Sequence, residues 1–400
     1  MGVALLDLND CNLQLWHGSE HVQSPGYALH RDRKYQYGTQ ARAAARLHPR
    51  DINTRYWWQL STEKLQPELG QARHSADLAH GHLLQMHREA GQPAETIFAV
   101  PGSMQREQLS LLLGIVQQCP FDAVGLVNRS VALASLYGQH ERLFHLEIQL
   151  HQAVISELSC SNNQVEAQRT VPLPGCGMLQ LQERLVEIIA AAFVRQTRFD
   201  PRRKAATEQQ LYDSLPAALN TLRESAETNI EINSYRARIA AADLESAGQR
   251  LFDSARDSIG MARPGDQLVA DPLAALLPGL GEALPGLHIS GADDLRRALE
   301  QHGDALLQRE QALSFVTSLP CLREGIVPDA GAAPPARAPA AEPAPAESTP
   351  THLLRDGLAR PLNGTGTGLA GGWELYRDCL LYTSDAADDQ WRVLFWGGGG

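Results

Sequence analysis

An aspartate near the N-terminus is the first residue of this chain whose setting could support chemistry. The apolar stretch VALLDL carries Asp7, and the turn-forming residues NDCN lie between it and the alternating stretch NLQLWH. A carboxylate at the tip of a β-hairpin can position a metal-bound water beside a phosphate, provided that small residues let the phosphate approach the backbone. The other interpretation is a polar residue that only ends a buried strand.

Other candidate chemistry has weaker support. The chain has fourteen histidines, and His80 and His87 lie seven residues apart in HSADLAHGHLLQMH. Metal sites favour closer pairs on a helix or convergent cysteines and carboxylates, so we interpret these histidines as core or surface residues and predict no metal site. The sequence contains neither a GxSxG nucleophile turn nor a GxxxxGK[ST] phosphate loop, so serine-hydrolase and P-loop functions are unsupported.

The composition is that of a globular protein with an acidic balance. The 400 residues are 43% apolar and carry a formal net charge of -11, which allows a sizeable core. No basic stripe offsets this charge, so we expect neither a nucleic-acid partner nor a membrane partner. The N-terminus lacks the features of a signal peptide, and the six cysteines form no CxxC pair. We therefore expect a cytoplasmic protein with reduced thiols.

The elements that position Asp7 alternate between strands and helices. Period-two alternation predicts one hairpin across VALLDL and NLQLWH and a second in RLFHLEIQLHQAVISEL, residues 142–158. Between them, SADLAHGHLLQMHREA has helical spacing, TIFAVPG is typical of a buried strand, and MQREQLSLLLGIVQQC predicts another helix. Helices that follow strands in this way indicate an α/β fold.

Composition also divides the chain into segments. Residues 1–325 are expected to form the folded domain, and the Pro/Ala-rich residues 326–350 are expected to form an extended linker. Residues 351–378 begin with THLLRDGLARPLNGTG, which predicts the start of a truncated small β module. The stretch CLLYTSDAADD, which begins at Cys379, resembles the translation of a sequencing-library adapter. We therefore interpret residues 379–400 as an artefact.

Three segments occur in an order that is typical of one known family. They are YGTQARAAARLHP (residues 37–49), a strand–helix–strand–helix run (residues 97–138) and NIEINSYRARIAAADLESAGQRLF (residues 229–252). Together they resemble the nucleotide-binding domain of the 70-kilodalton heat-shock chaperones, in the actin, hexokinase and chaperone ATPase superfamily. The resemblance implies an actin-like ATPase fold, in which two similar lobes of mixed sheet, flanked by helices, surround a central cleft that holds ATP.

The first phosphate hairpin of that family is only partly present. Its DLGTTNS motif falls on residues 7–13, where Asp7 and Asn12 are retained. Asn9 in place of the first glycine can still adopt a left-handed turn. Asp10 in place of a hydroxyl residue would put a carboxylate where the resemblance places anionic phosphate.

The other nucleotide motifs depart further from the family. Its DLGGGT hairpin falls on residues 145–150, HLEIQL, where no glycine remains. Its conserved acid in the NEPTAAA-type helix falls on Arg129, and its adenosine GG turn falls on residues 270–272, ADP. The helix that would clamp adenosine reads LPAALNTL and has lost its charges. Gly175 and Gly177, in PLPGCGML, retain a family-like glycine turn.

These losses favour a pseudo-ATPase: a bacterial-type, heat-shock-70-like protein that binds or assembles a protein partner or client. The alternative is a divergent ATP-dependent molecular chaperone that binds ATP and Mg²⁺. If nucleotide is bound, the resemblance implies contacts from Asp7, Asn9, Asn12, Gly175 and Gly177. Whether the chain is an enzyme stays open. A carbohydrate kinase of the same superfamily would need a catalytic aspartate in the sugar-side lobe, and we identify none.

An aromatic cluster lies where the family has its catalytic lysine segment. The sequence INTRYWWQL places Tyr56, Trp57 and Trp58 next to one another in a chain with only 6% aromatic residues. Core packing beneath a lobe is the simpler interpretation. The other is that these side chains fill a cleft that nucleotide has vacated.

Overall fold

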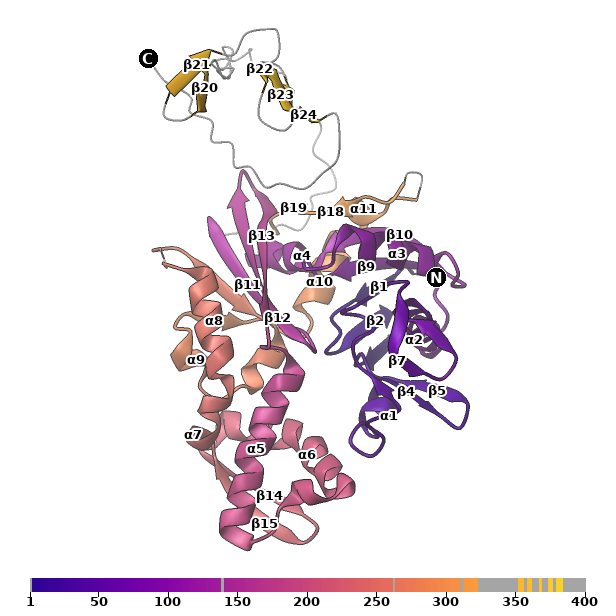
Figure 1. The fold of residues 1–400 in the computed structure, drawn as a ribbon, viewed down its shortest axis with the longest axis vertical. Helices are drawn as coiled ribbons and strands as arrows, with labels where there is room; N and C mark the ends of the chain where they lie inside the picture. Colours follow the sequence, from indigo (N-terminus) through magenta and orange to yellow (C-terminus); the bar gives the residue numbers. More distant parts are fainter. Residues whose placement is uncertain are drawn as a thin grey trace, which may run out of the picture. The chain divides into compact units, whose positions relative to one another are not determined.

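A computed structural model of the chain describes residues 2–137, 140–261, 263–309 and 312–322, together with five strands between residues 352 and 383 (Figure 1). The chain divides into two compact units, Met1–Val327 and Pro328–Gly400. The first unit combines mixed sheets with helices, so the predicted α/β class is confirmed. Among the described residues, no helix is both long and apolar enough to cross a bilayer.

The second unit contains two small antiparallel sheets. One is a hairpin of β20 (His352–Arg355) and β21 (Leu358–Pro361), and the other consists of β22 (Thr367–Gly368), β23 (Trp373–Tyr376) and β24 (Cys379–Thr383). The predicted linker at residues 326–350 lies outside the described residues, as do residues 384–400. The truncated module and the adapter-derived tail therefore stay predictions.

One six-stranded mixed sheet is built mainly from the N-terminal third of the chain. Its strand order is β18-β10-β9-β1-β2-β3. The β1–β2 hairpin predicted around Asp7 is confirmed, and β9 runs parallel to β1. The strands are β1 (Ala4–Asp7), β2 (Leu13–His17), β3 (Glu20–Ser24), β9 (Glu95–Val100), β10 (Asp122–Asn128) and β18 (Phe315–Val316).

Helices and two small sheets pack around this first sheet. Helix α2 forms where helical spacing predicts it, because Leu78, His82, Leu83 and Met86 lie on one buried face. The helices are α1 (Thr39–Arg42), α2 (Ser75–Glu89) and α3 (Arg106–Val116); the small sheets contain β4 (Ala28–Arg31), β5 (Lys34–Tyr37), β6 (Ile52–Asn53), β7 (Lys64–Leu69) and β8 (Ala72–His74).

The second six-stranded sheet shares five strand positions with the first and differs in the sixth: β18 lies beyond β10 in the first sheet, whereas β19 lies beyond β13 in the second. Its order is β17-β16-β11-β12-β13-β19, so in each sheet a three-stranded meander is extended past its first strand by two parallel strands. The predicted second hairpin is β11–β12. The strands are β11 (Arg142–Ile148), β12 (Gln152–Ser161), β13 (Gln164–Pro174), β16 (Gln267–Ala270), β17 (Leu287–Ile289) and β19 (Ser318–Pro320).

Helix α5 extends from the second sheet to a separate hairpin, beside which α6 lies (Figure 1). Helix α5 buries Leu181, Leu185, Ile189 and Phe193, which repeat every four residues, and it ends at the left-handed residue Arg198. With α6 it packs against the β14–β15 hairpin. The elements are α5 (Met178–Thr197), η2 (Pro201–Arg203), α6 (Ala205–Glu224), β14 (Glu227–Ile232), β15 (Tyr235–Ala240), α7 (Ala241–Leu244) and η3 (Glu245–Gly248).

The two sheets share a core around one short helix. Helix α4 (Arg129–Ala134) is buried along its whole length and contacts strands of both sheets. Its small residues Ser130, Ala132 and Ala134 allow this close approach. The remaining elements of the first unit are η1 (Ser135–Tyr137), α8 (Gln249–Ile259), η4 (Pro272–Leu276), α9 (Leu280–Ala283), α10 (Asp294–Gln301) and α11 (Gly303–Leu306). We call the first sheet with α1–α3 and the two small sheets the first half of this unit, and the second sheet with the other elements the second half.

Candidate functional site

The turns of the β1–β2 and β11–β12 hairpins bond directly to each other. The Leu150 amide in the β11–β12 turn donates to Asp10 Oδ1 at 2.7 Å. The side-chain amide of Asn9 in the β1–β2 turn donates to the Ile148 carbonyl at 3.1 Å. Asp10, expected to repel phosphate, thus accepts a backbone hydrogen bond from the second hairpin. These two bonds join the turns directly to each other.

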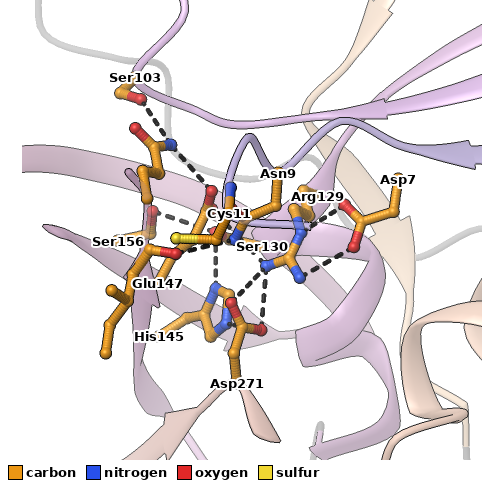
Figure 2. Close-up of polar contacts among 12 residues, drawn as sticks. Asp7, Asn9, Cys11, Ser103, Arg129, Ser130, His145, Glu147, Ser156 and Asp271 are labelled. Atoms are coloured by element: carbon orange, nitrogen blue, oxygen red, sulfur yellow. Dashed lines mark hydrogen bonds and ion pairs between the residues drawn. The ribbon is translucent and has the colours of Figure 1, made fainter. Parts of the chain in front are cut away.

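Beside these turns, a buried guanidinium is surrounded by carboxylates (Figure 2). Arg129 Nε donates to Asp7 Oδ1 at 2.6 Å, and its Nη2 donates to Asp7 Oδ2 at 3.1 Å. Its Nη1 lies 3.0 and 2.9 Å from the two carboxylate oxygens of Asp271 and 3.7 Å from Glu147 Oε2. Arg129 is 5% exposed, Asp7 and Glu147 are each 1% exposed, and Asp271 is 5% exposed. We call these four residues the Arg129 cluster.

The topology explains why distant residues meet here. Asp7 ends β1, Asp271 follows β16, and Arg129 begins α4 directly after β10, so all three lie at the carboxyl ends of parallel strands. Open α/β sheets commonly bind ligands at such strand ends. Asn128 fixes the start of α4, because its side-chain oxygen accepts from the amides of Ser130 and Val131 at 2.9 and 3.2 Å.

A histidine and two serines extend the cluster into the second sheet. His145 Nε2 lies 3.2 Å from Asp271 Oδ1, and its Nδ1 lies 2.8 Å from Ser130 Oγ. Ser130 in turn donates to Ser156 at 3.1 Å. His145 is 1% exposed, so these contacts replace the water that would otherwise satisfy its ring nitrogens.

Burial and neighbouring charges shift the pKa values of the carboxylates of the cluster in different directions. Burial alone would raise the pKa of Asp271, but the charge of Arg129 and the contact with His145 lower it to about 2. Burial raises the pKa of Asp7, and the attraction of Arg129 offsets only part of that effect. Burial likewise raises the pKa of Glu147, whose Oε2 has no hydrogen-bond partner among the described residues. Asp271 is therefore the firmly ionised partner of Arg129.

This arrangement is poorly suited to phosphate. A phosphate site needs free N–H donors and room for a tetrahedral anion. Here Nε, Nη1 and Nη2 of the guanidinium are all engaged by carboxylates, and both oxygens of Asp7 are engaged by Arg129. Asp7 is therefore not free to position a metal-bound water. Within the part of the chain that the structure describes, no group of three histidine, cysteine or acidic side chains could hold a metal ion.

Gly177 lies against the second hairpin turn. The amides of Met178 and Leu179, at the start of α5, donate to the carbonyls of Gln149 and Leu150 at 2.8 and 3.0 Å. A Cβ on Gly177 would lie 2.3 Å from the carbonyl carbon of His151, so only glycine permits this contact. The N-terminal amides of α5, which could otherwise bind an anion, are thus taken up by protein backbone.

The other predicted nucleotide contacts lie at different distances from the cluster. Asn9 stays beside it through its bond to Ile148. Asn12 bonds Gln23 on the exposed side of the β1–β2 hairpin at 2.9 Å. Gly175 has a φ of 73° and packs under the guanidinium of Arg250. The structure therefore brings Asp7 and Asn9 together and places Asn12 and Gly175 elsewhere.

Sequence reasoning found the substitutions at this site but missed that they compensate one another. Arg129 and Asp271 were each recognised only as departures from a family motif. The available signal was a reversal of charge: a base stands where the family has an acid, and an acid stands where it has glycine. His145 and Glu147 carried no separate signal, since polar residues alternate with apolar ones in any half-buried strand, whereas the structure buries both faces of β11.

The three residues of the aromatic cluster do not share one environment: two pack in the core and one does not. Tyr56 and Trp57 belong to the core of the first half, so the core-packing prediction is confirmed for them. It is wrong for Trp58, which is 37% exposed and stacks on His151 with 5.1 Å between ring centroids. Trp58 also lines a cavity of about 250 Å³ that is bordered by Asp10, Gln149 and Gln152. It therefore lies beside the turns that carry the site.

Comparisons with known proteins do not assign the chain to a family. No protein-family model matches the chain, and no curated protein matches its sequence.

Asp10 should make the stability of the protein depend on pH. Burial raises the pKa of Asp10 from 3.8 to about 7; the Leu150 amide opposes this shift, and the charge of Glu147 adds to it. As pH rises, the unfolded state loses this proton first. The free energy of unfolding should therefore fall by about 1.4 kcal/mol per pH unit between roughly pH 4 and pH 7 because of this one group.

The variant Asp10→Asn isolates this contribution, because its amide oxygen can still accept from Leu150. The free energy of unfolding should fall by about 2 kcal/mol more in the wild type than in the variant between about pH 5 and pH 7, which denaturant unfolding of both proteins would measure. A difference that is the same at both pH values would show that Asp10 is ionised throughout this range.

Proposed function

We propose that the chain is a pseudo-ATPase related to the 70-kilodalton heat-shock chaperones. In this proposal it has an actin-like fold of two lobes, does not bind ATP, and works in the cytoplasm by binding or assembling a protein partner. The five-strand arrangement that the two sheets share, a meander followed by two parallel strands, supports the two-lobe fold. In this proposal, the ancestral phosphate site lay between the β1–β2 and β11–β12 turns, and the hydrogen bonds that now join these turns support that location.

The observation that carries the proposal is the Arg129 cluster. A positive side chain supplied by the protein occupies the hydrogen-bonding capacity of Asp7, the acid that the chaperone resemblance would assign to metal and water. Opening this cluster for Mg-ATP would require a buried guanidinium to leave at least two carboxylates. Breaking such a buried ion pair costs about 3 to 5 kcal/mol, before any phosphate contact forms.

Contacts between the two halves favour a scaffold that does not open and close with nucleotide. Arg46, which follows α1, donates from Nη2 to Glu183 on α5 at 2.5 Å, and its amide donates to Gln209 on α6 at 2.8 Å. Its guanidinium also lies 3.8 Å from the centroid of the Tyr212 ring. These contacts hold the first half against α5 and α6 at a second place, away from the Arg129 cluster.

The alternative is a divergent ATP-dependent chaperone. It would need Arg129 to swing away from Asp7 and the two hairpin turns to separate. The N-terminal amides of α5 would also have to give up the carbonyls of Gln149 and Leu150. The closed arrangement supports the pseudo-ATPase more directly, because it satisfies these groups without a ligand.

The two candidates differ in how nucleotide affects a bound partner. The full-length chain, carrying an affinity tag, is recovered from cells that express it, and the column is washed with buffer, Mg-ADP or Mg-ATP. A pseudo-ATPase scaffold should retain the same partners under all three washes, which quantitative mass spectrometry would measure. Release by Mg-ATP alone would favour the chaperone, and the absence of any enriched protein would contradict the proposed binding function.

A further inference from the structure

A short segment near the end of the first unit connects its two sheets (Figure 1). Strand β18 runs parallel to β10 in the first sheet, with Phe315 paired to Leu126. Two residues later β19 runs antiparallel to β13 in the second sheet, with Leu319 paired to Val165. We call residues 315–320 the bridging segment, because it contributes one strand to each sheet.

Two cysteines meet where the bridging segment ends. Cys160 lies near the end of β12 and is paired with Val165 across the β12–β13 hairpin. Cys321 directly follows β19, and its amide donates to the carbonyl of Asn163, in the turn of that hairpin, at 2.9 Å. The Cys321 thiol lies close enough to the Cys160 thiol to raise the pKa of Cys160. Both side chains are half-buried and pack against the core shared by the two sheets.

We propose that Cys160 and Cys321 form a reversible disulfide that locks the bridging segment onto the β12–β13 hairpin. The oxidant is a small disulfide such as oxidised glutathione. One cysteine thiolate attacks a glutathione sulfur and releases the first reduced glutathione; the second cysteine then displaces the other glutathione from the mixed disulfide. Two protein thiols and one oxidised glutathione thus give one protein disulfide and two reduced glutathiones.

The setting of Cys160 makes this lock slow to close. Burial and the neighbouring Cys321 thiol raise the pKa of Cys160 to about 11. Its thiolate is therefore scarce at neutral pH. Below pH 11, the rate of attack by Cys160 should rise about tenfold for each unit by which the pH is raised. Brief exposure to oxidant at neutral pH should leave the pair reduced, whereas sustained exposure should oxidise it.

The oxidised protein should be harder to unfold. The disulfide closes a loop that runs from β12 through most of the second half to the bridging segment, which restricts the unfolded chain. We expect the unfolding midpoint to rise by roughly 5 to 10 °C and to return on addition of dithiothreitol. This inference does not depend on the proposed function, since it involves no residue of the Arg129 cluster.

The test uses the full-length protein incubated with oxidised glutathione at about pH 8.5 and then alkylated. Trypsin should yield residues 143–169 joined to residues 310–323, each of which contains a single cysteine. Cys160→Ser and Cys321→Ser should lose both the joined peptide and the rise in midpoint. Cys119→Ser, which alters a thiol bonded to the Ile115 carbonyl on α3, should behave like the wild type.

Two results would overturn the proposal. One is glutathione bound separately to Cys160 or Cys321 in the wild-type protein, with no peptide that joins them. The other is a failure of both thiols to react under conditions that fully oxidise a dithiol peptide control. The decisive measurement is the joined peptide from wild-type protein, so the test remains valid even if a serine variant folds poorly.

Discussion

Replacing Arg129 by methionine should lower the free energy of unfolding by about 3 to 5 kcal/mol. The change keeps most of the side-chain length but removes the guanidinium that Asp7 and Asp271 share. At least one buried carboxylate is then left without a compensating charge, which is the costly way to break a buried ion pair. Denaturant unfolding near pH 7, with circular dichroism as the signal, would measure the loss.

Two further proteins separate loss of the ion pairs from loss of packing. Arg296→Met removes an exposed pair with Glu300 on α10 and should cost less than about 1 kcal/mol. Adding Asp7→Asn and Asp271→Asn to Arg129→Met removes the stranded charges and should restore much of the loss. If the single variant were as stable as the wild type, the Arg129 cluster would not be the buried, charged centre described here.

Trp57→Ala should destabilise the protein by about 3 to 5 kcal/mol, whereas Trp58→Ala should cost about 1 kcal/mol. Trp57 is 4% exposed, and its indole N–H donates to His82 Nδ1 at 3.1 Å. Burial lowers the pKa of His82 to about 3, so its ring stays neutral and can accept this bond. Trp58 loses only its stacking on His151 and its partial burial.

The neighbouring tryptophans are matched controls for each other, because they share residue type and local sequence. Thermal and denaturant unfolding of both variants would rank them. Equal losses would contradict the division of the aromatic cluster into a core pair and an exposed member. A larger loss for Trp58→Ala would mean that this residue, rather than Trp57, supports the first half.

Local periodicity was enough to predict the elements that carry the site. Alternation identified the β1–β2 and β11–β12 hairpins, and the spacing of Leu78, Leu83 and Met86 identified α2. These patterns are visible because each element buries one face against a core. Strands β18 and β19 were not predicted, since two or three residues are too few to show a period.

The pairing at the candidate site could not be predicted in the same way. Asp7, Arg129 and Asp271 lie far apart in the sequence and meet only because the carboxyl ends of β1 and β10 in the first sheet lie beside the carboxyl end of β16 in the second. Gly177 shows a related limit. A glycine that admits protein backbone has the same sequence signal as a glycine that admits phosphate, and here the close neighbours are His151 and Gln152.

Titration of the full-length protein with Mg-ATP and Mg-ADP by calorimetry tests the central claim most directly. The Arg129 cluster and the bonded hairpin turns predict no saturable heat and no rise in the unfolding midpoint, even at millimolar nucleotide. The matched variant Asp7→Asn, which keeps the shape of the side chain, should behave in the same way. Micromolar binding by the wild type that weakens in Asp7→Asn would contradict the account and place phosphate at the β1–β2 turn.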